Sequence, residues 1–181
     1  MLAETFLADI NIDDIQSEHM QLIASYCGLS DALALMERMP GLELYIPASA
    51  KRWFDWDYIK ENYTGFNAAT VAGKLGLNRE DVIAISKQPA PMGDGLSNEH
   101  IRLVADKCGL DIAKRLARNF PGYKFYIPLN GLSIAVKRYI ERSFNGTNTQ
   151  ELALQCGITE RYVRKIISEK HNAATQLSLF S

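Results

Sequence analysis

The chain repeats itself, and this repeat restricts the possible folds more than any other feature of the sequence. At an offset of 81 residues, EHMQLIASYCGL at residues 18–29 aligns with EHIRLVADKCGL at residues 99–110, and PGLELYIP at residues 40–47 aligns with PGYKFYIP at residues 121–128. Both matches keep this offset without a gap. A fixed internal period indicates a duplicated structural unit. We therefore expect two units of the same fold in one chain.

Length and composition place the boundaries of these units. A chain of 181 residues is long enough for two small domains, each with its own core. The segment KQPAPMGDGL after the first unit is rich in Pro and Gly, which is typical of a linker. We predict a first unit at residues 1–86, a linker at 87–97, a second unit at 98–170 and a tail at 171–181.

Each unit has the same order of expected elements: two helices, a short strand, a third helix and a helix-turn-helix. The strands, at residues 42–46 and 123–127, are rich in Tyr, Phe, Leu and Ile, which favour β-structure. One short strand cannot satisfy its backbone polar groups alone. We expect the two strands to form an antiparallel two-stranded ribbon in a mainly α-helical fold. The chain would then form a pseudo-dimer within itself, and a further homodimer remains open.

The second unit ends in a helix-turn-helix pattern at residues 144–167. Ala153 lies in its first helix, Gly157 follows four residues later, and Val163 begins a series of apolar residues at three- to four-residue spacing. This spacing is typical of a helix-turn-helix. Asn148, with Glu151 three residues later, has the spacing of a helix N-cap and capping box.

The polar residues of this pattern are the candidate DNA contacts. The outward positions of the expected recognition helix, residues 159–167, are Thr159, Glu160, Arg161, Tyr162, Arg164 and Lys165. Arg can bind guanine through two hydrogen bonds, whereas Lys acts more as a point charge. Thr149 and Gln150 begin the preceding helix, where backbone N–H groups and short polar side chains often bind phosphate. Lys137 and Arg138 are further candidates for phosphate contact.

Each group of candidates also has a purely structural interpretation. The recognition-helix residues could form a solvated helix face, and Thr149 and Gln150 could serve only as caps. Lys137 and Arg138 could belong to an ordinary exposed surface. The sequence leaves these alternatives open.

The net charge of −1 conceals an uneven distribution. Residues 1–97 carry 7 Lys/Arg and 14 Asp/Glu, a formal charge of −7, whereas residues 98–181 carry 13 and 7, a formal charge of +6. Phosphate contacts need positive charge locally rather than over the whole protein. The second half of the chain is therefore the half expected to face DNA.

The first unit differs from the second where DNA contacts are expected. Asp81, Ile83 and Ala84 occupy the positions that carry a tyrosine, an arginine and a lysine in the second unit. A carboxylate repels phosphate, and Ile and Ala offer no hydrogen bond to a base edge. The helix expected at residues 78–86 is therefore either a degenerate DNA reader or a protein-binding surface.

Together these features resemble the Mor/C family of phage transcription activators. The resemblance is strongest at residues 99–167, in the Tyr-Ile-Pro strand end, the Gly-x-Asn segment and the Cys-Gly-Ile-Thr-Glu turn. It implies that residues 97–128 belong to a dimerisation region and that residues 159–167 read the major groove of a promoter. It also implies double-stranded DNA and RNA polymerase as partners, in a phage or mobile element. Activation and repression both remain open.

The tail carries a second, shorter resemblance. The final QLSLF segment is similar to the motif by which bacterial proteins bind the β sliding clamp of DNA polymerase III. By that resemblance Gln176 orients the peptide, and Leu177, Leu179 and Phe180 fill an apolar pocket. Residues 171–175 are small and polar, so we expect a flexible spacer there. A tail that folds back onto the core is the alternative.

Other functions find less support in the sequence. The three cysteines have no Cys-x-x-Cys spacing and no neighbouring histidine cluster, so we expect no metal site. No nucleophile–base arrangement or phosphate-binding loop is present, so we expect neither a cofactor nor enzymatic activity. Without a long apolar run or a basic leader, the chain is expected to be cytoplasmic, with no membrane contact. A clamp-associated interaction protein and a protein-only adaptor or inhibitor remain the rival interpretations.

Overall fold

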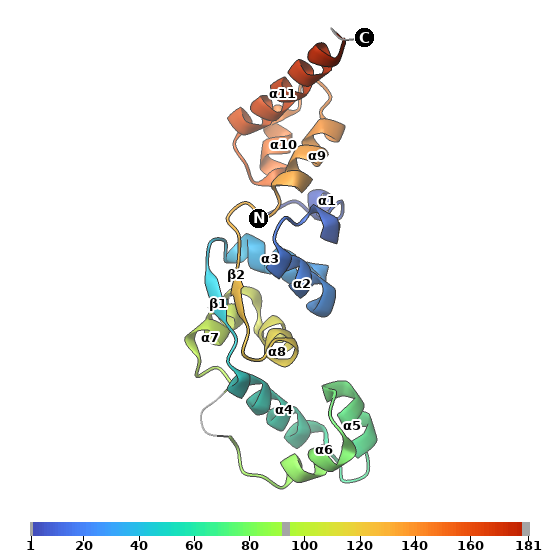
Figure 1. Cartoon of the computed structure of the whole chain (residues 1–181), viewed down its shortest axis with the longest axis vertical. Coiled ribbons are helices and arrows are strands. Elements are labelled where there is room, and N and C mark those ends of the chain that lie inside the picture. Colours follow the sequence, from blue (N-terminus) through green and yellow to red (C-terminus); the bar gives the residue numbers. More distant parts are fainter. Residues whose placement is uncertain (1, 92–94, 179–181) are drawn as a thin grey trace.

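The computed structural model describes residues 2–91 and 95–178, with side chains described as far as residue 170 (Figure 1). This part of the chain is mainly α-helical and contains one two-stranded antiparallel sheet. The predicted fold class is therefore confirmed.

The same order of elements occurs in both halves of the chain. A short helix α1 (Glu4–Leu7) and a 3₁₀ helix η1 (Ile12–Asp14) come first. The first half then forms α2 (Glu18–Cys27), α3 (Leu29–Arg38), β1 (Glu43–Tyr45), α4 (Ala48–Asn62), α5 (Ala68–Leu75) and α6 (Arg79–Ser86). The second half forms α7 (Glu99–Cys108), α8 (Leu110–Asn119), β2 (Lys124–Tyr126), α9 (Ser133–Ser143), α10 (Thr149–Cys156) and α11 (Glu160–Ser178).

In the ribbon of β1 and β2, equivalent residues of the two halves of the chain pair with each other at the centre. Leu44 pairs with Phe125, its equivalent at the 81-residue offset, and both side chains are fully buried. The strands are shorter than predicted, but their hydrogen bonds continue into the flanking residues. Ile46 N donates to the Tyr123 carbonyl at 2.8 Å, and the equivalent bond in the opposite direction has the same length.

Two equivalent histidines satisfy outward backbone groups of this ribbon. Tyr126 N donates to His19 Nδ1 and Tyr45 N donates to His100 Nδ1, each at 3.1 Å. The acceptors lie on α2 and α7, so each helix binds the strand from the other half of the chain. These bonds protect strand groups that a two-stranded ribbon would otherwise leave unpaired.

We call α2, α3, α7, α8 and the ribbon the central body. Gly28 and Gly109, with φ angles of 106° and 105°, let α2 pass directly into α3 and α7 into α8. Helix α2 packs on α3 and α8, and α7 packs on α8 and α3. Arg115 donates two hydrogen bonds, of 2.6 and 2.8 Å, to the buried carboxylate of Asp31. This bidentate pair connects α8 to α3.

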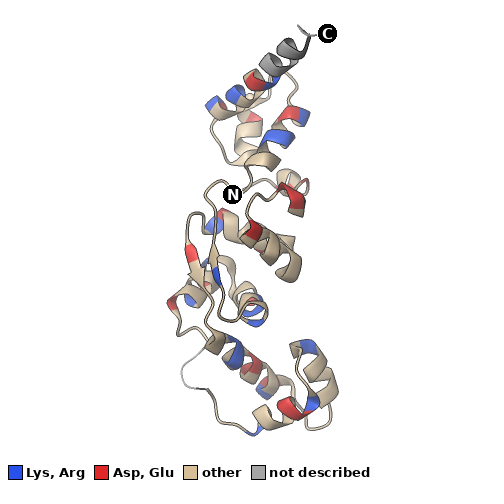
Figure 2. Ribbon diagram, in the orientation of Figure 1, with Lys and Arg blue, Asp and Glu red and all other residues tan. Residues whose placement is uncertain are grey.

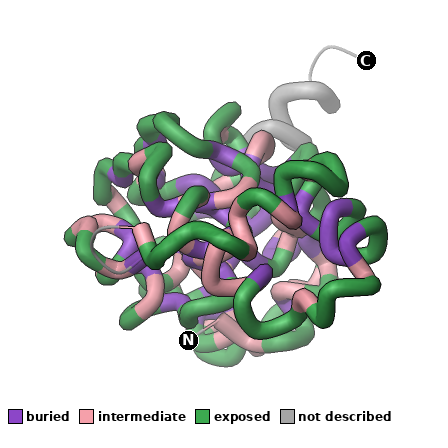
Figure 3. Tube along the Cα trace, turned by 90° about the horizontal axis from the view of Figure 1, so that it is seen from below, coloured by how far each residue is buried: buried purple, intermediate pink, exposed green. Residues whose placement is uncertain are grey.

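A helix-turn-helix domain lies at each end of the central body (Figure 1). The first consists of α4–α6 and the second of α9–α11. The buried residues of α5 and α6 form a cluster of their own with Ile59 of α4, whereas those of the second domain join the cluster of the central body. Figure 3 shows buried segments inside the molecule and exposed segments around its periphery. The two domains are therefore attached to the body in different ways.

Candidate DNA-binding site

A small apolar core holds α11 of the second domain in place. Val163 and Ile166 of α11 and Ala153 and Cys156 of α10 are buried, and the two helices pack together. At the turn between them Gly157 has a φ angle of 64°, a left-handed conformation that glycine adopts without a steric cost. This arrangement presents the opposite side of α11 to solvent.

The exposed side of α11 is rich in positive charge. Arg161, Arg164 and Lys165 are all exposed, and the side chains of Arg164 and Lys165 keep 69% and 65% of their accessible surface. Residues three and four positions apart share one face of a helix, so the three cations form one ridge. Figure 2 shows Lys and Arg along the first turns of α11.

Glu160 connects the two helices at the beginning of α11. The Thr149 hydroxyl donates to Glu160 Oε1 at 2.8 Å, and Arg164 Nη2 donates to the same oxygen at 2.6 Å. These hydrogen bonds, with that from Thr149 the larger effect, lower the pKa of Glu160 below its ordinary value. A guanidinium has five N–H donors, so one bond to Glu160 leaves Arg164 with capacity for a base or phosphate.

The loop before α10 is closed by Asn148 in a way that the sequence analysis did not predict. Asn148 occupies the N-cap position but makes no side-chain capping bond. Its Oδ1 instead accepts from Asn145 N, and its Nδ2 donates to the Ser143 carbonyl, both at 3.0 Å. The predicted capping box of Asn148 and Glu151 is therefore wrong. The amide side chain bonds backward, to the loop and to the end of α9.

The first domain uses the same loop arrangement. Asn67 Oδ1 accepts from Thr64 N at 2.9 Å, and Asn67 Nδ2 donates to the Asn62 carbonyl at 2.8 Å. The Gly-x-Asn segment occurs at the same place in both halves of the sequence. That recurrence was a signal for a shared loop closure, because an N-cap alone does not require asparagine.

Three other predicted site residues lie around the start of α10 and α11. Thr159 Oγ1 accepts from Tyr162 N at 3.3 Å and so caps α11. Tyr162 and Gln150 are exposed. The structure therefore gives Thr159 a capping role and leaves the side chains of Gln150 and Tyr162 accessible.

Lys137 and Arg138 are neighbours on α9 but have different surroundings. Lys137 is exposed and lies 4.0 Å from the carboxylate of Glu141 on the same helix. Arg138 donates to the Asp14 carboxylate at 2.5 Å and to the Asp9 carbonyl at 2.6 Å. A DNA contact by either residue remains a prediction, but the Arg138 guanidinium already binds the N-terminal part of the chain.

The first domain presents different chemistry on the equivalent surface. Asp81 and Ala84 of α6 are exposed and Ile83 is half-buried. Phe66, in the loop before α5, is 99% exposed, and its equivalent at the 81-residue offset is Thr147. Phe66 is not a defined position of any motif in the sequence and was therefore not predicted as a site residue. A fully exposed aromatic ring is unusual. A single exposed apolar side chain does not by itself indicate a contact surface, so other features must support that interpretation.

The predicted clamp-binding residues fall at the limit of the described chain. Gln176 and Leu177 lie within α11, whose backbone is helical to Ser178, and their side chains are not described. Leu179 and Phe180 lie outside the described residues. Residues 171–175, expected as a flexible spacer, also lie within α11. Clamp binding therefore stays a prediction.

The sequence of the second half of the chain matches a known protein family. The sequence model of the Mor transcription activator family matches residues 85–178, slightly more than half of the chain, and the matched part contains α7–α11. The chain belongs to the Mor transcription activator family. It is accordingly a DNA-binding transcription regulator. No curated protein and no solved structure matches the chain.

Within residues 2–91 and 95–178, no group of three or more His, Cys, Asp or Glu side chains is arranged to hold a metal ion. None of the helices in the same part of the chain is both long and apolar enough to cross a membrane.

Proposed function

We propose that the chain is a sequence-specific transcription regulator whose second helix-turn-helix domain reads DNA. The observation that carries this proposal is the exposed ridge of Arg161, Arg164 and Lys165 on α11, within the part matched by the family. A recognition helix in the major groove reads bases with its exposed side chains. Thr149 and Gln150, at the N-terminus of α10, suit phosphate contacts beside it.

In this proposal the chain is a duplicated Mor-like unit that acts as an intrachain pseudo-dimer. The reciprocal pairing of Leu44 with Phe125, and the reciprocal backbone bonds to His19 and His100, support it. Packing of α2 on α8 and of α3 on α7 has the same reciprocity. The central body would then replace the interface that two separate subunits form in a homodimer.

The first domain, in the same proposal, contacts a protein rather than bases. Its helix α6 exposes Asp81 and Ala84, and the loop before α5 exposes Phe66. An exposed aromatic side chain is a frequent anchor of protein interfaces, whereas a carboxylate repels the phosphate backbone. RNA polymerase is the partner implied by the family resemblance. Regulation in either direction fits this arrangement.

A DNA titration at low and moderate salt tests the proposal. The probe is a duplex that the wild-type chain selects from a random pool, with a scrambled duplex beside it. We expect tight, salt-sensitive binding to the selected duplex, and its loss when Arg161, Arg164 and Lys165 are all replaced by alanine. Selection of no duplex, or full binding by the triple variant, would contradict the proposal.

Binding of the β sliding clamp through the tail is a separate prediction. Deletion of residues 176–181 should abolish any clamp binding and leave the affinity for the selected duplex unchanged. Clamp binding that survives the deletion would exclude the QLSLF segment as the motif.

A further inference from the structure

The N-terminal segment, residues 2–16, lies between the central body and the second helix-turn-helix domain (Figure 1). Two successive residues bind the two sides. Leu2 N donates to Glu37 Oε1 of α3 at 2.7 Å, and Ala3 N donates to the Gln155 carbonyl of α10 at 3.0 Å. The segment therefore links the body to the domain proposed to read DNA.

Apolar packing reinforces this link. Phe6 is fully buried, and its ring meets that of Tyr139 on α9 edge-on, with centroids 5.2 Å apart. Helix α1 also packs against α10. A buried aromatic pair of this geometry adds to the stability given by burial of area alone. Helix α1 thus acts as an additional helix of the second domain.

Ion pairs join the same segment to α9. Arg142 Nη1 donates to Asp9 Oδ1 at 2.8 Å, and Arg138 binds both Asp14 and the Asp9 carbonyl. Asp14 is only 4% exposed, and a buried carboxylate is costly unless it is paired. These contacts favour one position of α9 relative to the segment.

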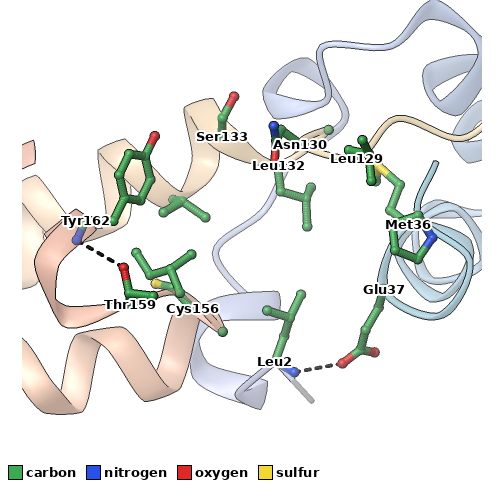
Figure 4. Close-up of a pocket in the computed structure, with 15 residues that line it drawn as sticks. Leu2, Met36, Glu37, Leu129, Asn130, Leu132, Ser133, Cys156, Thr159 and Tyr162 are labelled. Carbon is green, nitrogen blue, oxygen red and sulfur yellow. Dashed lines mark hydrogen bonds between the residues drawn. The ribbon is translucent and has the colours of Figure 1, made fainter.

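A cavity separates the central body from the start of α11 in this region (Figure 4). Its volume is about 850 Å³, and Met36 of α3 and Tyr162 of α11 are on its lining. Figure 4 shows Leu2 between Glu37 on one side and Cys156 on the other. Helix α11 packs on α9 and α10, and here the cavity lies between it and α3.

The loop that enters α9 also depends on the N-terminal segment. Helix α4 follows Pro47 directly, whereas residues 129–132 form turns between β2 and α9. Gln16 N donates to the Gly131 carbonyl at 3.3 Å, and Ser133 Oγ donates to Gln16 Oε1 at 2.6 Å. These bonds connect the loop and the first residue of α9 to the N-terminal segment.

The first domain is attached directly through its first helix. Helix α4 packs directly on α8, where Arg118 Nε lies 3.6 Å from Asp55 Oδ1 and Lys114 Nζ lies 3.9 Å from Asp57 Oδ2. A continuous helix packed on the body needs no separate support. The second domain is connected to the ribbon by a loop before α9, so it needs an additional support.

We propose that residues 2–16 are a brace that holds the second helix-turn-helix domain in one orientation relative to the central body and so positions α11 for DNA. Only its link to DNA reading rests on the proposed function. Phe6, Asp9 and Asp14 are positioning residues, because they act through α9 rather than by touching DNA.

Two variants weaken the brace by different means. Phe6→Ala removes the contact with Tyr139 without a change of charge. Arg142→Glu replaces an ion pair with repulsion at a side chain that is 60% exposed, so the fold should tolerate it. Lys107→Glu, at an exposed position on α7, is the matched control for the change of charge.

The first readout is structural and needs no DNA. We expect both variants to accelerate amide hydrogen exchange in residues 2–16 while exchange in α7 and α8 stays as in the wild type. Small-angle X-ray scattering should show a broader distribution of interatomic distances. Unchanged exchange, or accelerated exchange with an unchanged scattering curve, would overturn the proposal.

The second readout is affinity for the duplex selected by the wild-type chain. We expect Phe6→Ala to weaken binding by roughly two- to thirtyfold, the range that indirect coupling gives, with an unchanged salt dependence because no phosphate contact is lost. Lys107→Glu should bind as the wild type does. Full affinity in a chain with a loosened brace would overturn the positioning role. If the wild type selects no duplex, the proposed function fails, and the structural readout still decides whether the brace exists.

Discussion

Among single residues, Glu160 best illustrates how local chemistry sets up the proposed reading surface. An acidic residue at the start of a recognition helix faces the phosphate backbone unfavourably. Here its carboxylate accepts hydrogen bonds from both Thr149 and Arg164. The carboxylate also interacts favourably with the N-terminal end of the helix dipole. Glu160 therefore fixes the guanidinium of Arg164 and connects α10 to α11.

Arg164→Ala tests whether this guanidinium reads a base. We expect the variant to lose about 1–3 kcal/mol of binding free energy on the selected duplex and much less on scrambled DNA. The measurement is a pair of equilibrium titrations at one salt concentration. Equal losses on the two duplexes would show that Arg164 contacts phosphate.

The lowered pKa of Glu160 gives a prediction for pH. Because the folded-state pKa lies below the unfolded value, the hydrogen bonds contribute stability above the unfolded pKa, and this contribution is lost as the pH falls through the folded pKa. Thr149→Val removes the larger cause, so the pKa of Glu160 should rise toward its ordinary value. An NMR titration of the Glu160 carboxyl carbon measures this change, and an unchanged pKa would contradict the assigned cause.

At the scale of elements, the loops before α5 and α10 depend on one asparagine each. Asn67 and Asn148 each bond both to the loop and to the end of the preceding helix. We expect Asn148→Ala to cost about 1–3 kcal/mol of unfolding free energy, since each lost hydrogen bond contributes roughly 0.5–1.5 kcal/mol. Asn67→Ala should have a similar cost. Urea unfolding measures both, and a negligible loss in either variant would show that its loop is held otherwise.

Local patterns in the sequence predicted the elements well where periodicity and turn residues agree. The helices of the two repeated units, the ribbon and the turn at Gly157 follow from such patterns. The direction of the Asn148 side chain could not be predicted, because asparagine is equally suited to an N-cap and to a hydrogen bond back to the preceding loop. The backbone bonds from Tyr45 and Tyr126 to the two histidines could not be assigned either, since their partners are distant in sequence.

For the molecule as a whole, the central body is proposed to act as a fused dimer interface. If that is correct, the ribbon forms within one chain and its stability is independent of protein concentration. Sedimentation velocity over a wide range of dilution should show a monomer at every concentration. Circular dichroism over the same range should show an unchanged helical signal. Loss of helical signal on dilution would mean that the units associate between chains.

The N-terminal segment could not be placed from the sequence. Its acidic residues predicted only negative charge, yet Asp9 and Asp14 pair with Arg138 and Arg142 on α9. These partners are more than 120 residues away, and the segment has no counterpart in the repeat that would reveal its role. The exposed positions of α11 were predicted more completely, because α11 is a local element whose exposed residues follow from its period.

The central claim is that one of the two helix-turn-helix domains reads DNA, and a hydroxyl-radical footprint tests it most directly. The selected duplex would be probed with the wild-type chain and with the Arg161, Arg164 and Lys165 triple alanine variant. We predict one protected stretch of backbone, on either side of a single major-groove segment, in the wild type and none in the variant. Two equivalent protected sites, or protection that survives in the variant, would contradict the assignment of DNA reading to α11.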